Sequence, residues 1–290
     1  MEGRTLTKGN LHQPVTAWTQ RQTTVSPGLM RVRHVARTGK TGPFTALLHH
    51  VTPELLATSY SALKRKAAAG IDGCTWESYG ENLQERLDVL HARLHDGSYR
   101  AKPARRVYID KADGTKRPLS ILCVEDKIAQ HAVSQVLHAI YEEEFIGFSY
   151  GFRPGRSQHR ALDALYTGLL YRKVNWVLDL DIQRFFDAVN HDWMIRMLAH
   201  RIADRRVLRL ICAWLKVGIA DDKGRQERSE CGLPQGAVIS PVLANVFLHY
   251  VFDLWSHKWR SRQAQGDMII IRFADDGVPR RRGKEAVMVT

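Results

Sequence analysis

Two apolar segments that end in carboxylates constrain the fold most strongly. WVLDLD begins at residue 176 and MIIIRFADD begins at residue 268, so each predicted strand finishes on acids: Asp179 and Asp181 in one case, Asp275 and Asp276 in the other. Burying an acid at the end of a strand costs desolvation free energy unless a cation compensates the charge. If the two strands pair antiparallel, the acids meet and repel one another, which favours a divalent metal such as Mg²⁺. The alternative for Asp275-Asp276 is an ordinary turn after a strand.

The charge of the chain indicates the kind of partner it binds. The 290 residues include 43 Lys and Arg against 30 Asp and Glu, a net charge of +13. A balance this basic favours a polyanionic partner, usually nucleic acid, although an unspecialised basic protein is the alternative. No segment approaches the ~18 apolar residues of a membrane span, and the N-terminus lacks the apolar region of a secretory signal. The four cysteines form no CxxC pair, which fits a reducing compartment, and we expect a cytoplasmic protein without a membrane partner.

The hydrophobic pattern predicts an alternation of helices and strands. An Asp113-Gly114 turn between two β-rich runs predicts a hairpin over 105–122. The other expected elements are a helix from Pro53 to Gly70, an amphipathic helix ending near Asp96-Gly97, a helix with one buried face over 128–140, a helix capped by Ser157, a helix with Ser240 at its N-cap and Pro241 at its first position, and the two strands that end in acids.

Five blocks in order resemble those of a known family. They read YIDKADGTKRPLSI, GFSYGFRPGRSQHRAL, WVLDLDIQRFFDAVNH, GLPQGAVISPVLANVFLHYVFD and RFADD. Together they resemble the successive blocks of a reverse transcriptase encoded by a bacterial group II intron, from about Phe44 to Asp276. GFRPGRS and PQGAVISP are similar to the intron lineage rather than to retroviral enzymes.

The resemblance implies an α+β fold, a right-hand polymerase with an antiparallel palm sheet and packed helices. On this basis residues 1–43 form a flexible basic arm, 44–170 the fingers, and 171–290 an incomplete palm. On the same basis we expect the thumb to be absent.

The resemblance also implies the metal ligands and the reaction. Asp181, Asp275 and Asp276 would be catalytic and would bind two Mg²⁺ ions, with Mn²⁺ as an alternative, and the backbone carbonyl of Ile182 would be a further ligand. Asp179 has the weaker claim. The primer 3′-hydroxyl would attack the α-phosphorus of a dNTP.

Contacts to the substrate follow from the same blocks. The incoming nucleotide would be held by Lys111, Arg117, Phe186, Gln235 and Gly236. Lys111 and Arg117 would hold the triphosphate, Phe186 would exclude a ribose 2′-hydroxyl, and Gln235-Gly236 would let the backbone approach the nucleotide. For the two basic residues, a solvated hairpin is the alternative. Phe185 is expected to face the core, although the sequence leaves open which phenylalanine is the gate.

Nucleic-acid contacts are implied for two arginines of the GFRPGRS block. Arg153 and Arg156 resemble contacts to template or triphosphate, with an exposed basic loop as the alternative. Proteins of this family bind their own intron RNA as maturases, so the partners implied are intron RNA as template, a DNA primer or target, and dNTPs. The arm, with Arg31, Arg33, Arg37 and Lys40, suits RNA binding or is a solubilising tail.

The pattern breaks after RFADD. The family continues with an apolar strand, whereas this chain reads GVPRRRGKEAVMVT. Because Pro279 cannot donate to a sheet ladder, we expect the palm to lack a strand and to expose an edge. An alternative function is therefore a catalytically inactive, truncated RNA-binding remnant. An RNA-directed RNA polymerase is disfavoured by Phe186.

Overall fold

The computed structural model describes residues 26–39, 42–110, 116–172, 174, 176–220, 226–227 and 230–281. Within these ranges, residues 116–118, 176–177, 226–227 and 276–281 are described by their backbone alone. Residues 1–25 of the predicted arm lie outside the described residues, as does Lys40.

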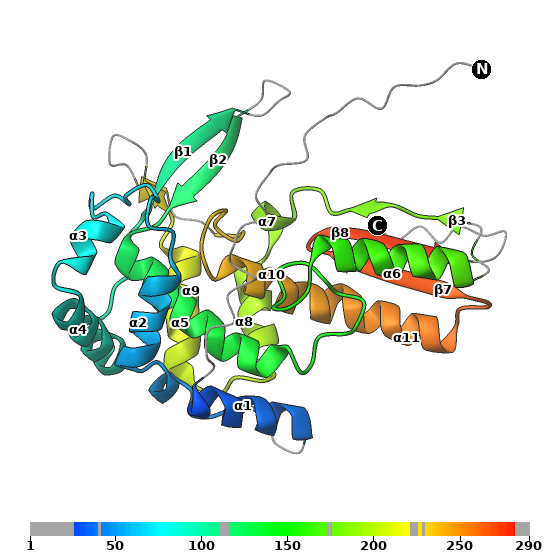
Figure 1. Ribbon diagram of the computed structural model, residues 1–290, viewed down its shortest axis with the longest axis horizontal. Coiled ribbons are helices and arrows are strands. Elements are labelled where there is room, and N and C mark those ends of the chain that lie inside the picture. Colours follow the sequence, from blue (N-terminus) through cyan, green and yellow to red (C-terminus); the bar gives the residue numbers. More distant parts are fainter. Residues whose placement is uncertain are drawn as a thin grey trace.

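The described part of the chain is a mixture of helices and short strands (Figure 1). The helices are α1 (Pro27–Thr38), η1 (Leu48–His50), α2 (Pro53–Ala62), α3 (Trp76–Gly80), α4 (Leu83–Asp96), α5 (Val124–Tyr141), α6 (Gln158–Tyr171), α7 (Phe185–Ala188), α8 (His191–Ala199), α9 (Arg205–Lys216), α10 (Ser240–Leu248), η2 (His249–Asp253) and α11 (Leu254–Arg262). The strands are β1 (Ala104–Asp110), β2 (Lys116–Ile121), β3 (Trp176–Val177), β4 (Leu180–Asp181), β5 (Ile219–Ala220), β6 (Gln226–Glu227), β7 (Met268–Phe273) and β8 (Asp276–Arg281).

Helix α5 is the centre of the helical part. It packs against α1, α2 and α10, and residues on almost every side of it are buried, among them Ile128, Val133 and Tyr141. A helix that is apolar nearly all round belongs inside a domain. The expectation of a single buried face was therefore too narrow. Leucines of α4 and residues of α8, α9 and α10 complete the same core.

Helix α1 corrects the prediction of a flexible arm over 1–43. Ser26 caps the helix by accepting a hydrogen bond from the amide of Leu29, and Pro27 occupies the first turn. Leu29 and Val32 are buried against the core, and Arg33 pairs with Glu143 at 2.5 Å. The polar residues between the apolar positions obscured the helical periodicity of this segment. For residues 27–38 the prediction of a flexible arm is wrong.

Most predicted helix boundaries agree with the structure. Helix α4 ends at Gly97, which takes the left-handed conformation with φ of 82°. Ser157 caps α6 by accepting from the amide of Arg160. Helix α2 ends at Ala62 and not at Gly70.

The start of α10 differs by one residue from the prediction. Its N-cap is Ile239, and Ser240 is the first helical residue. The Ser240 hydroxyl donates to the carbonyl of Pro234 at 2.9 Å. It therefore holds the preceding loop onto the helix, and the prediction that Ser240 is the N-cap is wrong.

The predicted hairpin is present and belongs to a larger sheet. β1 and β2 pair antiparallel, from Arg105 opposite Ile121 to Asp110 opposite Lys116. β5 pairs parallel to β1, and β6 follows it, so the strand order is β2-β1-β5-β6. In Figure 1 the hairpin projects from the helical part.

The second sheet contains the strand that the sequence argued against. β8 pairs antiparallel with β7 on one side and with β3 and β4 on the other, so it is the central strand. Pro279 lies opposite Ile270 of β7. Extending the register of β4 places it opposite Leu178, where the ladder between β3 and β4 is interrupted. The prediction that the palm lacks a strand after Asp276 is therefore wrong, because a proline fits where no ladder bond is required.

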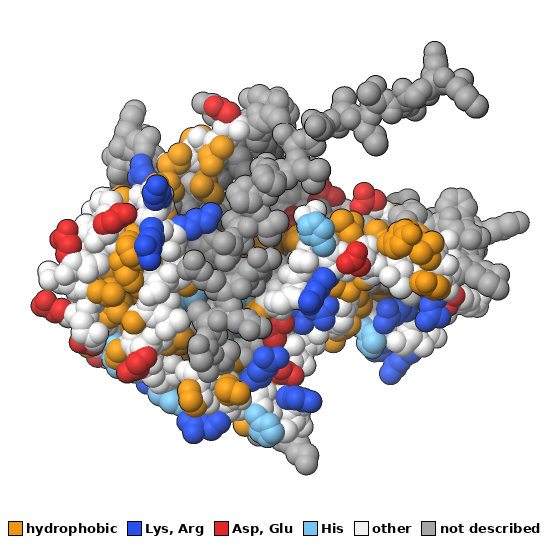
Figure 2. Space-filling view, in the orientation of Figure 1, with side chains coloured by type: hydrophobic (Ala, Val, Ile, Leu, Met, Phe, Trp, Pro, Cys, Tyr) orange, Lys and Arg blue, Asp and Glu red, His pale blue; other side chains and the backbone are white. Residues whose placement is uncertain are grey.

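Helices cover both faces of this sheet (Figure 1). A Cβ added to Gly168 of α6 would lie 2.5 Å from the side chain of Ile269, so α6 packs closely on one face of β7. Arg272, three residues later on the opposite face, meets η2. The outer side of α6 exposes Leu162, Tyr166 and Leu170, and apolar side chains gather over α6 in Figure 2. Within the described ranges no helix combines the length and the apolar character that crossing a bilayer requires.

Candidate active site

The sheet brings together the acids that end the two apolar segments. β4 and β8 are neighbours, with Asp181 directly opposite Asp276. Residues that face each other in this way have Cβ atoms about 4.5–5.5 Å apart. Asp275 lies in the two-residue turn that joins β7 to β8, next to Asp276. The side chain of Asp181 is exposed and that of Asp275 is half-buried, so both are open to a ligand.

The turn that holds Asp275 has an unusual backbone. Phe273 pairs with Asp276, which leaves Ala274 and Asp275 as the two turn residues. Ala274 has φ of 59°, a region that favours glycine in tight hairpin turns. For another residue such a conformation costs about 1–3 kcal/mol and persists only where the surroundings impose it. Backbone strain therefore coincides with the candidate acids.

A second segment of chain lies against this turn. A Cβ added to Gly151 would lie 2.1 Å from the amide nitrogen of Ala274, closer than any side chain could come. The amide of Tyr150 also donates to the carbonyl of Arg272 at 2.8 Å. The glycine of the GFRPGRS block thus permits direct backbone contact with the acidic turn.

The residues that follow Asp181 form a tight turn into α7. The carbonyl of Ile182 accepts a hydrogen bond from the amide of Phe185 at 3.2 Å, and the Ile182 side chain is exposed. Phe185 is buried, as predicted. Phe186 is half-buried and meets Phe185 edge to face, with ring centroids 5.4 Å apart. Its role as the gate remains a prediction.

The PQG loop is tied to the hairpin. The carbonyl of Gln235 accepts from the amide of Ser120 in β2 at 2.8 Å. Gly236 has φ of 98°, and a Cβ there would lie 2.6 Å from the Ser120 carbonyl oxygen. The side chain of Gln235 reaches Asp187 at 3.4 Å. The loop therefore connects the β1–β2 hairpin with the segment after β4.

The two basic residues of the hairpin are only partly placed. Lys111 lies outside the described residues. Arg117 lies in β2 opposite Ile109, and its backbone alone is described. A role for either residue with a triphosphate remains a prediction.

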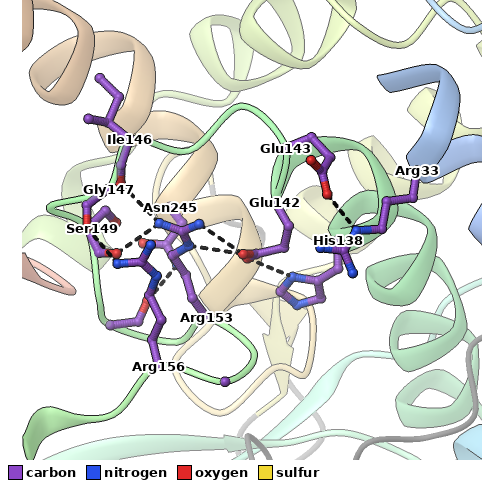
Figure 3. Close-up of polar contacts among 12 residues, drawn as sticks. Arg33, His138, Glu142, Glu143, Ile146, Gly147, Ser149, Arg153, Arg156 and Asn245 are labelled. Atoms are coloured by element: carbon purple, nitrogen blue, oxygen red, sulfur yellow. Dashed lines mark hydrogen bonds and ion pairs between the residues drawn. The ribbon is translucent and has the colours of Figure 1, made fainter. Parts of the chain in front are cut away.

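The placement of Arg153 contradicts its predicted contact with nucleic acid. The side chain is buried, and its guanidinium donates to Glu142 Oε2 at 3.0 and 3.1 Å and to the carbonyls of Ile146 and Ser149 (Figure 3). Burial alone would raise the pKa of Glu142, but the nearby His138 ring and the Arg153 guanidinium lower it below its usual value. Arg153 therefore shapes the GFRPGRS loop from inside.

Arg156 is better placed to meet a ligand. It is half-buried, donates to the carbonyl of Gly147 at 2.5 Å and lies over the ring of Tyr150, 4.9 Å from its centroid. Burial lowers the pKa of its guanidinium, which nevertheless stays charged at neutral pH.

Three buried polar residues near the turn were not predicted. Arg272, Asp253 and Asn245 form one hydrogen-bonded group. The sequence carried a signal for it, since an arginine inside the apolar strand MIIIRF requires a buried partner. Nothing local to that strand identified the partner.

The donor set of this corner fits a divalent cation. The carboxylate oxygens of the acids and the carbonyl oxygen of Ile182 are the hard ligands that Mg²⁺ prefers. Among the described side chains no group of three His, Cys, Asp or Glu residues is placed to hold a metal. The side chain of Asp276 is not in that described set.

The acids lie together at one end of an antiparallel sheet, and similarity to known proteins identifies the family of this chain. The model of the family "Reverse transcriptase (RNA-dependent DNA polymerase)" matches residues 109–287. The chain belongs to this family of RNA-directed DNA polymerases. Protein YkfC of Escherichia coli K12 is 37% identical over 229 residues, which are 76% of this chain and 60% of that protein.

Other relatives confirm the resemblance to the group II intron lineage. The group II intron-encoded protein LtrA of Lactococcus lactis subsp. cremoris is 33% identical over 71% of this chain and 34% of that protein. Nuclear intron maturase 4, mitochondrial, of Arabidopsis thaliana is 22% identical over 75% of this chain and 26% of that protein. The chain thus spans less than two thirds of the length of these relatives.

Proposed function

We propose that this chain carries the polymerase centre of a group II intron reverse transcriptase. It would add dNTPs to the 3′-hydroxyl of a DNA primer, with intron RNA as template. The observation that carries this proposal is the register of β4 and β8, which sets Asp181 opposite Asp276, the residue that follows Asp275.

The acids of this corner would hold two Mg²⁺ ions, together with the carbonyl of Ile182. When bound, the ions would loosen the proton of the primer hydroxyl and stabilise the triphosphate and the departing pyrophosphate. The chain's own contribution is geometric. Asp181 and Asp276 come from opposing strands, and Asp275 lies in the turn between β7 and β8, so the fold brings the backbone positions of the three acids together.

The surrounding loops would select the nucleotide. The Gln235-Gly236 loop, held on β2, would support the base pair, and Phe186 would lie beneath the sugar. Arg117 and Lys111 of the hairpin would contact the triphosphate. The support for the roles of Gln235, Gly236 and Phe186 is that the loop before α10 contacts both β2 and the segment after β4 that carries Phe186.

Intron RNA binding is the second part of the proposal. The relatives named for intron-encoded and maturase proteins support it. The exposed arginines of α1, Arg31 and Arg37, and the half-buried Arg156 offer phosphate contacts. We expect RNA affinity to fall steeply with salt.

Primer extension tests the polymerase proposal. The assay uses the full chain, an RNA template with an annealed DNA primer, dNTPs and Mg²⁺, and compares Asp181→Asn with Asp267→Asn. Asp267 lies just before β7, at the far end of the same hairpin from the acids, and pairs with Arg172 at 3.7 Å. Metal stabilisation is worth several kcal/mol, so Asp181→Asn should reduce extension by about 10³-fold or more.

Two results would overturn the polymerase proposal. One is equal extension by the two variants. The other is absence of extension by folded wild-type chain that still binds RNA, which would favour the RNA-binding remnant.

A further inference from the structure

Arg272 is a fully buried arginine whose every N–H group is engaged. Nε and Nη2 donate to the two carboxylate oxygens of Asp253, each at 2.7 Å. The remaining three N–H groups donate to Asn245 Oδ1 at 3.1 Å, the Ala274 carbonyl at 2.8 Å and the Ser149 hydroxyl at 2.7 Å. A guanidinium has five such groups, so this one is saturated.

The partners of Arg272 come from three separate parts of the chain and meet at the acidic turn. Ser149 belongs to the segment that lies against β7, and Asn245 and Asp253 belong to the helix behind the sheet. Asn245 also donates to the carbonyl of Gly151 at 2.8 Å. Arg272 therefore fastens the turn, the segment at Ser149 and the helix to one another, and Asn245 extends the contact to Gly151.

A π-helical turn is what lets both helix residues reach Arg272. Asn245 and Asp253 are eight residues apart, which in an α-helix would point them about 80° away from each other. In η2 the amide of Leu254 bonds to the carbonyl of His249, so the turn absorbs one extra residue. The separation then corresponds to about seven α-helical residues, or nearly two full turns, and both side chains lie on one face.

This arrangement is more elaborate than stability requires. A buried ion pair loses as much in desolvation as it gains, and apolar residues of the same size often stabilise a fold equally well. The hydrogen bond to Ala274, however, acts on the one residue of the turn that has a left-handed backbone. This bond holds the backbone of the turn that carries Asp275 and leads into Asp276.

We infer that Arg272 is a positioning residue for the metal-binding acids: through the Ala274 carbonyl it fixes the turn in the geometry that lets Asp275 and Asp276 share a divalent cation with Asp181. This inference rests on the proposed function of the acids. Because Arg272 is fully buried, it would act through the turn and not by direct contact with metal or substrate.

Binding of Mn²⁺, followed by electron paramagnetic resonance on the full chain, tests the inference without requiring catalysis. Arg272→Lys keeps the charge and loses the forked geometry. Partners that orient metal ligands typically contribute 10–100-fold, so the Kd for Mn²⁺ should rise by about tenfold or more. Hydrogen exchange of the amides over 273–277 should accelerate in the same variant.

Two further variants separate positioning from folding. Ser149→Ala keeps the Asp253 pair and removes one acceptor, so it should fold and weaken Mn²⁺ binding severalfold. Arg201→Lys is the matched control, because Arg201 forms a largely buried pair with Glu144 and lies over Phe44, on other elements. It should bind Mn²⁺ as the wild type does.

The outcomes distinguish this inference from the proposed function. If Asp181→Asn binds Mn²⁺ as tightly as the wild type does, both the proposed function and the positioning role are overturned. Binding that depends on Asp181, but is the same within twofold in folded Arg272→Lys and Ser149→Ala, would overturn the positioning role alone. In primer extension, the positioning role predicts a fall in kcat that high Mn²⁺ partly restores, with little change in the KM for dNTP.

Discussion

Substituting Gly151 with alanine should displace the acidic turn directly. The new Cβ would lie 2.1 Å from the Ala274 nitrogen, 2.8 Å from its Cα and 2.9 Å from the Phe273 carbonyl carbon. All three atoms are backbone, so no side chain can rotate away. Ordinary contact begins at 3.4 Å, which leaves a shortfall of about 1.3 Å that the loop or the turn must supply.

The expected consequences differ for activity and for stability. Displacement of a reacting group by about 1 Å can lower a rate by 10²-fold, so we expect primer extension to fall by about that factor. Overpacking of this kind costs about 1–3 kcal/mol of unfolding free energy. Gly151→Ala should therefore still fold although its activity is lost.

Gly147→Ala provides the matched control. Gly147 lies in the same loop, four residues earlier, and a Cβ there would meet nothing within 4 Å. The assay is primer extension beside thermal unfolding for both variants. If Gly151→Ala extends primers as well as Gly147→Ala does, the close approach of loop and turn has no bearing on the site.

Three further predictions concern stability. Burial lowers the pKa of His131 from 6.5 to about 4. Below pH 6.5, His131 therefore becomes protonated in the unfolded chain while it stays neutral in the folded chain. The unfolding free energy should fall by about 2 kcal/mol from pH 7.5 to pH 5, and denaturant titrations of His131→Gln should show that loss removed. Gly236→Ala should cost about 1–3 kcal/mol, measured the same way, because its Cβ would lie 2.6 Å from the Ser120 oxygen; an unchanged midpoint would contradict the close approach. Ser157→Ala removes the acceptor for the Arg160 amide and should cost about 1 kcal/mol, whereas Ser157→Asp should retain stability.

The parts of the fold that were predictable are those written in local patterns. An apolar run ending in acids identified β4 and β7, and Asp113-Gly114 identified the β1–β2 hairpin. Gly97 marked the end of α4 because a left-handed residue there satisfies the last carbonyls. In each case neighbouring residues alone decide the conformation.

The parts that failed depend on distant partners. Pro279 excluded a strand by local reasoning, yet the neighbouring ladder is interrupted where the proline lies. Arg153 belongs to a basic loop, and only the position of Glu142 shows that it is buried. The pairing of Arg272 with Asp253 likewise requires a π-helical turn, which the hydrophobic periodicity of the sequence does not predict.

The central position of β8 has a consequence for how the protein is made. Leu180 of β4 pairs with Gly277, 97 residues further along the chain. At about 5–20 residues per second, the ribosome would complete β8 some five to twenty seconds after β4 emerges. During that interval β3 and β4 have no partner, and their free backbone groups are open to other nascent chains. We therefore expect the yield of soluble protein to depend on translation speed and chaperone supply over residues 182–276.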